Sequence, residues 1–111
     1  MEISRGAIVI VAGRATFSTK PRPAVVVQAN FLIETHPTIL LAPMTSELLD
    51  QPSIRIGLDP TPENGLRVRS EIMADRLITI RRSQIDRVVG RLDPDNMLRL
   101  EQALFVVLGL S

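Results

Sequence analysis

Three short apolar runs rich in β-branched residues constrain the fold of this chain more than any other feature. They cover residues 7–11, 24–28 and 38–42. Gly, Pro, Asn or Thr bound each run, and such runs are typical of well-buried strands. Residues 53–58 alternate polar and apolar side chains, as a half-exposed strand does. Residues 70–75 and 77–81 predict two more strands, or one bent strand, ahead of a polar turn at 82–86. Short strands at this spacing favour a small barrel or a strongly curled sheet.

The C-terminal third changes from strand to helical periodicity. Asp93 is a good N-cap and Pro94 suits the first helical position. Apolar residues then recur at helical spacing, at Met97, Leu100, Leu104 and Leu108. The sequence therefore predicts an α+β fold, mainly β, with about five to six strands and a C-terminal α-helix.

The apolar surface of this helix is wider than one stripe. The residues that widen it are Leu98, Phe105, Val106 and Val107. One interpretation is that the helix packs on its own sheet on one side and on a second copy of the chain on the other, in a homodimer. The alternative is a helix set deep against a short barrel, since helices of small domains can be apolar on most sides.

Length and composition exclude several classes of protein. A chain of 111 residues with 45% hydrophobic residues predicts one domain over residues 1–111. It contains no cysteine, which excludes disulfides and thiolate chemistry, and its one histidine, His36, lies in no metal-ligand motif. No cofactor or metal is expected. The apolar run at 7–12 is too short for a signal peptide or a membrane span, so a soluble, cytoplasmic protein is expected.

All but one of the 13 basic residues are arginine, although the net charge is only +1. The planar guanidinium matches phosphate oxygens bidentately, so this bias favours a phosphate-containing ligand. Genomic base composition is an alternative explanation. Trp and Tyr are absent, which argues against an aromatic platform for stacking bases.

Two short motifs each place one polar side chain at the edge of an apolar strand. They are Lys20-Pro21-Arg22-Pro23 and Ala42-Pro43-Met44-Thr45-Ser46. A guanidinium able to hold phosphate beside a hydroxyl predicts a site that acts on RNA. The simpler alternatives are that Arg22 only shapes the start of a strand between two prolines, and that Thr45 bonds nearby backbone.

The order of these motifs resembles the MazF/PemK family of toxin endoribonucleases. Its R-G-D/E-I pattern is similar to Arg5-Gly6-Ala7-Ile8, its K-T-R-P-x-x-V to residues 20–26, and its P-x-T-S to residues 43–46. The resemblance continues through Gly65-Leu66, residues 70–75 and 77–80, and the terminal helix. It covers most of the chain.

The resemblance implies an SH3-like curled barrel that acts as a homodimer, cuts single-stranded RNA without a metal and is inhibited by a cognate antitoxin protein. DNA would be involved only indirectly, through the antitoxin. The family's catalytic pair corresponds to Arg22 and Thr45. Such a pair suits attack of an RNA 2′-hydroxyl on its own phosphate, because a guanidinium and a hydroxyl can stabilise the charge on the phosphoryl oxygens. The products would be a 2′,3′-cyclic phosphate and a 5′-hydroxyl.

Other residues are secondary candidates. Asp75 matches an acidic residue of the family and is expected to orient Arg22 or a base, or else to serve as an ordinary salt-bridge partner or a cap. Arg14, Lys20 and Ser46 are expected to contact the RNA strand; a solvated loop is the alternative for Arg14 and Lys20.

Some residues depart from the family pattern, and these differences bear on how tightly RNA is bound and on which site is cleaved. Ala7 and Pro21 replace the usual carboxylate and threonine, and Arg76 and Ile78 replace the usual Gln and Arg. A rival interpretation is a CcdB-like toxin, which has a similar fold and blocks DNA gyrase through its C-terminal helix. The Arg22 and Thr45 motifs argue against it, because that mechanism has no use for them.

Overall fold

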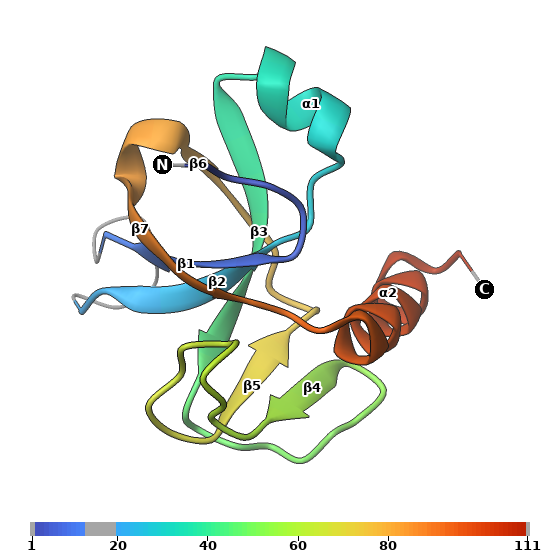
Figure 1. Cartoon of the computed structure of the whole chain (residues 1–111). Helices are drawn as coiled ribbons and strands as arrows, with labels where there is room; N and C mark the ends of the chain where they lie inside the picture. The colour runs from blue at the N-terminus through green and yellow to red at the C-terminus, as the bar shows by residue number, and fades with distance from the viewer. Residues whose placement is uncertain (1, 13–19, 111) are drawn as a thin grey trace.

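The computed structural model describes residues 2–12 and 20–110, and in these residues seven antiparallel strands form one curled sheet (Figure 1). The strands are β1 (Ala7–Val11), β2 (Arg22–Val26), β3 (Thr38–Thr45), β4 (Arg55–Leu58), β5 (Ser70–Met73), β6 (Ile78–Arg81) and β7 (Ile85–Arg91). They are joined by a short helix α1 (Asn30–Thr35) and a 3-10 turn η2 (Arg82–Gln84), and the chain ends in α2 (Pro94–Leu108).

Strand β3 is the centre of the sheet. The strand order is β4-β5-β3-β2-β1-β7, and β6 also pairs with β3. The first half of β3 pairs with β6, and its last two residues, Met44 and Thr45, pair with β5. Because one long strand serves both partners, the end of β3 is brought to the β4–β5 side of the molecule.

The central strands are buried on both faces, which explains their continuous apolar runs. Ile8, Val25 and Met44 belong to a core that includes Leu100 and Ala103 of α2. The residues on either side of Ile8 and Val25 in the sequence belong to a second core. The residues of this second core on β1, β2 and β3 are Ala7, Val9, Val11, Ala24, Val26, Ile39 and Leu41.

Helix α2 begins where the sequence predicts. The Asp93 carboxylate accepts a hydrogen bond from the Asn96 backbone N–H at 3.2 Å and from the Asn96 side chain at 2.7 Å. The side-chain hydrogen bond from Asn96 is the main reason that the pKa of Asp93 lies below its ordinary value. Leu98, Phe105 and Val106, spaced to share one side of the helix, are each at least half exposed. No helix in the described ranges is long and apolar enough to cross a bilayer.

The expected class, mainly β with a C-terminal helix, is confirmed, but the details differ. The described residues hold seven strands instead of five or six, and the sheet curls without closing into a barrel. The prediction of a polar turn at 82–86 was wrong in extent, because β7 follows η2 directly. Two register shifts against β1 break the alternation that would have revealed β7. Helix α1 was also missed; only Ile33 of its six residues is buried.

Strand β2 begins two residues earlier than expected, at Arg22. Over Arg22 and Pro23 it pairs with β1 alone, and its pairing with β3 starts at Ala24. The missing N–H of Pro23 therefore interrupts no bond between β2 and β3. Arg22 becomes part of the sheet, with a backbone direction fixed by its pairing with Val11.

Candidate active site

The start of β2 and the end of β3 lie at the same pocket. Ala24 is paired with Pro43, and extending this register by two residues on each strand sets Arg22 opposite Thr45. Residues opposite each other in an antiparallel pair project from the same face. Both residues line one pocket of about 470 Å³. Pairing between strands thus unites two side chains that lie far apart in sequence.

The pocket lining combines guanidinium and hydroxyl groups. Its arginines are Arg22, Arg67 and Arg87, and its hydroxyl residues are Thr45, Ser46 and Ser70. Apolar side chains make up most of the remaining wall, among them Ile10, Pro21, Pro23, Met44, Leu66, Val68 and Val89. Among the described residues, the lining includes no Asp, Glu or His. The pocket is therefore suited to an anionic ligand that also has apolar surface.

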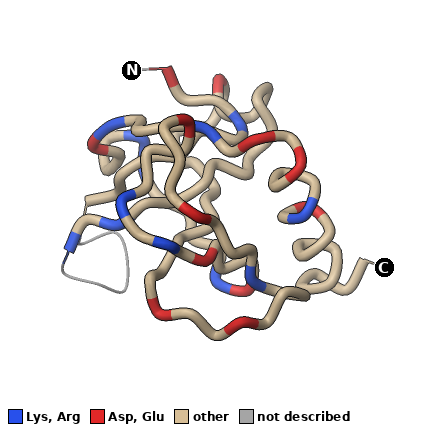
Figure 2. Tube along the Cα trace, turned by 60° about the horizontal axis from the view of Figure 1, so that its bottom comes forward, with Lys and Arg blue, Asp and Glu red and all other residues tan. Residues whose placement is uncertain are grey.

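The positive charge of the pocket is a local feature, because the molecule as a whole carries little net charge. Lys and Arg are interspersed with Asp and Glu over the trace (Figure 2), in agreement with the net charge of +1. Within the described ranges, the Arg22 and Arg67 side chains make no hydrogen bond or ion pair. Arg87 donates to its neighbour Asp86. Two of the three guanidinium groups thus keep all their donors for a ligand.

The Thr45 hydroxyl is oriented by the backbone two residues further along the chain. Its Oγ1 accepts a hydrogen bond from the Glu47 N–H at 3.0 Å. The O–H proton has no acceptor in the part of the chain that the structure describes. The backbone-bonding alternative is thus observed, yet it leaves the donor of Thr45 available to a ligand.

A tight turn builds the wall opposite β2 and β3. Residues 63–65 pack on β7, where the Arg91 N–H donates to Glu63 O at 2.8 Å. Gly65 has a φ of +68°, and a Cβ there would lie 2.2 Å from Val89 O, so only glycine fits. The turn directs Leu66, Arg67 and Val68 into the pocket lining.

The other sequence candidates lie in different places. Ser46 lines the pocket, whereas Lys20 is exposed and is not among the lining residues. Asp75 is also absent from the lining; its Oδ1 accepts a hydrogen bond from Arg55 Nε at 3.1 Å. Arg14 lies outside the described residues.

Two pocket arginines were missed by sequence reasoning. Neither Arg67 nor Arg87 was among the candidate residues named from the sequence. In the sequence, the only indication for Arg67 is its position two residues after Gly65. Contacts between distant residues bring it to the site, namely the pairing of β5 with β3 and the packing of the turn on β7. Over the described ranges, no group of three or more acidic or histidine side chains is arranged to hold a metal ion.

Comparison with known proteins identifies the family of the chain. Residues 4–108 match the model of the family described as PemK-like, MazF-like toxin of type II toxin-antitoxin system. The chain belongs to this family. The match favours the MazF/PemK resemblance over the CcdB-like alternative.

Individual MazF proteins are similar over nearly the whole chain. The curated "Probable endoribonuclease MazF" of Mycolicibacterium smegmatis is 36% identical over 107 residues, which is 96% of this chain and 97% of that protein. Among solved structures, an "Endoribonuclease in complex with its cognate antitoxin from Mycobacterial species" has a TM-score of 0.82 at 18% identity, with 99% and 98% of the two chains covered. A MazE-MazF structure from Deinococcus radiodurans has a TM-score of 0.79 at 19% identity, with 100% and 99% covered.

Proposed function

We propose that this MazF-family toxin is an endoribonuclease that binds single-stranded RNA in the pocket between β2, β3 and β7 and cleaves it with Arg22 and Thr45. One observation carries the proposal: Arg22 and Thr45 line the same pocket, each with donors that no described residue uses. The name of the M. smegmatis relative, an endoribonuclease, supports the same activity.

The reaction would be transfer within the RNA. The 2′-hydroxyl gives up its proton as its oxygen attacks the adjacent phosphorus, and the 5′-oxygen takes up a proton as its bond to phosphorus breaks, which leaves a 2′,3′-cyclic phosphate and a 5′-hydroxyl. Negative charge grows on the two non-bridging oxygens in the transition state. The Arg22 guanidinium can donate two directed hydrogen bonds to these oxygens, and the Thr45 hydroxyl can donate a third. Because the nucleophile belongs to RNA, a DNA strand would bind without being cut.

Metal independence is part of the proposal. The attacking oxygen comes from the substrate, so no metal-bound water is needed to supply it. Positive charge at the phosphate would come from Arg22 together with Arg67 and Arg87, all in the pocket lining.

A homodimer and an antitoxin complete the proposed assembly. The exposed side of α2 formed by Leu98, Phe105 and Val106 offers an apolar surface to a second copy. An acidic antitoxin segment would be attracted to the pocket arginines and would compete with RNA there. A cytoplasmic location, where RNA and antitoxin are synthesised, follows from the same proposal.

The test is cleavage of a mixed-sequence RNA by purified protein, free of antitoxin, in EDTA. We expect cutting by the parent and a loss of about a hundredfold or more for Arg22→Ala, the size typical of removing one main charge stabiliser. Arg22→Lys keeps the charge but not the planar fork, so it should recover only part of the rate.

Arg99→Ala is the matched control, because Arg99 lies on α2 and its guanidinium donates to Asn96 at 2.7 Å, away from the pocket lining. Its rate should equal that of the parent. Mapping the cleaved ends would identify the products. Intact RNA after incubation with folded parent would refute the proposed activity.

A further inference from the structure

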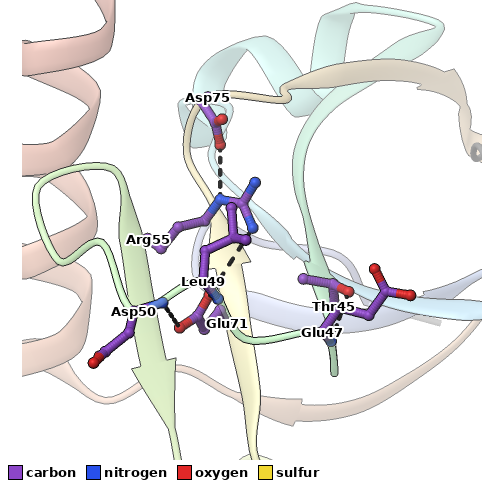
Figure 3. Close-up of polar contacts among 7 residues, drawn as sticks. All are labelled: Thr45, Glu47, Leu49, Asp50, Arg55, Glu71 and Asp75. Carbon is purple, nitrogen blue, oxygen red and sulfur yellow. Dashed lines mark hydrogen bonds and ion pairs between the residues drawn. The ribbon is translucent and has the colours of Figure 1, made fainter.

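A buried arginine lies close to the segment that follows the proposed catalytic threonine. Arg55 of β4 and Glu71 of β5 have side chains only 5% and 6% exposed, and Arg55 Nη1 lies 3.9 Å from Glu71 Oε1. On its other side the guanidinium donates from Nε to Asp75 Oδ1 at 3.1 Å (Figure 3). Arg55 thus lies between two carboxylates, one of which is almost fully buried.

The Glu71 carboxylate also holds the connection between β3 and β4. Its Oε1 accepts from the Leu49 N–H at 2.9 Å and its Oε2 from the Asp50 N–H at 3.0 Å (Figure 3). Asp50 has a φ of +59°, in the left-handed region that residues with a Cβ rarely occupy. Two charge-assisted hydrogen bonds to consecutive amides can maintain this conformation.

The anchored amides are close in sequence to the site. Glu71 is paired with Thr45 across β5 and β3. Only residues 46–48 separate Thr45 from the first anchored amide, and the Glu47 N–H within them is the donor that orients Thr45 Oγ1. The position of the Thr45 hydroxyl therefore depends on a segment fixed at one end by the strand pair and at the other by Glu71.

We propose that Glu71, oriented by Arg55, is a positioning residue that holds the segment after β3 so that Thr45 and Ser46 face the pocket. The inference rests on the proposed function, since it assigns a role in RNA cleavage to residues outside the pocket lining. It also gives Asp75 an indirect role: Asp75 supports Arg55, which orients Glu71, and so affects Thr45 only through these two residues and the segment after β3. The alternative is that the buried pair only stabilises the β4–β5 hairpin.

Glu71→Gln is the decisive variant. Glutamine keeps the size of the side chain, but its NH₂ group faces a backbone N–H, so at least one of the two amides loses its acceptor. We expect kcat for RNA cleavage to fall about tenfold or more, with KM changed less than about threefold, because the substrate-binding arginines remain in place. Amide hydrogen exchange at Leu49 and Asp50 should accelerate in the same variant, whether or not RNA is present.

Two controls separate positioning from a loss of stability. Ile56→Val removes one buried methyl group from β4 and should lower the unfolding temperature without changing kcat. Asp59→Asn makes the same carboxylate-to-amide change in the exposed ion pair with Arg69, and should change neither kcat nor exchange at Leu49 and Asp50.

A double-mutant cycle with Thr45→Val tests the route of the effect. If Glu71 acts through Thr45, the two losses in kcat will be strongly non-additive.

Leu49→Pro provides the test if Glu71→Gln does not fold. It removes one hydrogen-bond donor to Glu71 at an exposed position and leaves the buried pair of Arg55 and Glu71 intact. The kcat of this variant should fall at least about threefold with KM little changed.

The outcomes distinguish the two proposals. A parent that cuts RNA, with kcat or exchange unchanged in Glu71→Gln, would overturn the positioning role and leave the proposed function standing. Additive losses with Thr45→Val would overturn it as well. A folded parent that does not cut RNA would refute the proposed function and the catalytic part of the inference, while the exchange measurement would still decide whether Glu71 anchors the segment.

Discussion

Asn64 supports the turn that forms one wall of the pocket. The free energy of unfolding that is lost when its side chain is removed can be estimated from its hydrogen bonds. Asn64 is only 7% exposed. Its Oδ1 accepts from the Thr61 and Leu66 backbone N–H groups, both at 3.0 Å, and its Nδ2 donates to Asp59 O at 2.9 Å. Asn64→Ala removes all three hydrogen bonds.

We expect Asn64→Ala to lower the free energy of unfolding by about 3 kcal/mol, at about 1 kcal/mol net for each hydrogen bond. For a domain of this size the unfolding temperature should fall by about 12 °C, at about 4 °C for each kcal/mol. RNA binding should weaken too, because the turn directs Leu66, Arg67 and Val68 into the pocket.

Thermal unfolding followed by far-ultraviolet circular dichroism measures the effect, since the chain has neither Trp nor Tyr. All variants are compared at one protein concentration, because association with a second copy would raise the apparent stability. Asn30→Ala is the matched control: its Oδ1 accepts one exposed hydrogen bond, from the Arg5 N–H at 2.8 Å. If Asn64→Ala costs no more than Asn30→Ala, the argument that this network maintains the turn is refuted.

Two further predictions concern the pocket charge and the helix cap. Arg67→Ala should weaken binding of an uncleavable DNA strand and reduce the slope of log K against log salt by about 0.7, the value for one lost phosphate contact on a single strand; titrations at several salt concentrations measure it, and a slope equal to that of Arg99→Ala would contradict it. Asp93→Ala should cost about 1 kcal/mol at neutral pH through loss of the N-cap. The pKa of Asp93 is lowered in the fold, chiefly by the Asn96 side chain, so the stabilisation is present above the ordinary value of 3.8 and is lost as pH falls through the lower folded value. Urea unfolding at neutral and acid pH should therefore give a difference between parent and variant that shrinks in acid; a constant difference would rule out this linkage.

Sequence patterns worked best where a local rule applies. The strand at Ala7–Val11 and the N-cap at Asp93 agree with the structure residue for residue. Both depend on neighbours within a few positions: a β-branched run in the first case, and an acceptor followed by Pro94 in the second.

Patterns failed where a distant partner decides the conformation. β7 pairs with β1 through two register shifts, so its side chains do not alternate regularly. Asp75 was given two alternatives, and the structure has the ordinary salt bridge, with Arg55 of β4 as the partner. Nothing in the residues around Asp75 indicates that partner, because Arg55 lies in another strand.

The sequence alone determined the class of the fold, the buried strands, the terminal helix and the two short motifs that carry Arg22 and Thr45. Only the tertiary structure decided that these two side chains line one pocket with Arg67 and Arg87, and that Glu71 accepts hydrogen bonds from the segment that follows Thr45. The physical reason is that periodicity and capping arise from near neighbours in the chain. The convergence of a site depends on strand register and on the packing of a turn against β7, and these contacts join residues that are distant in sequence.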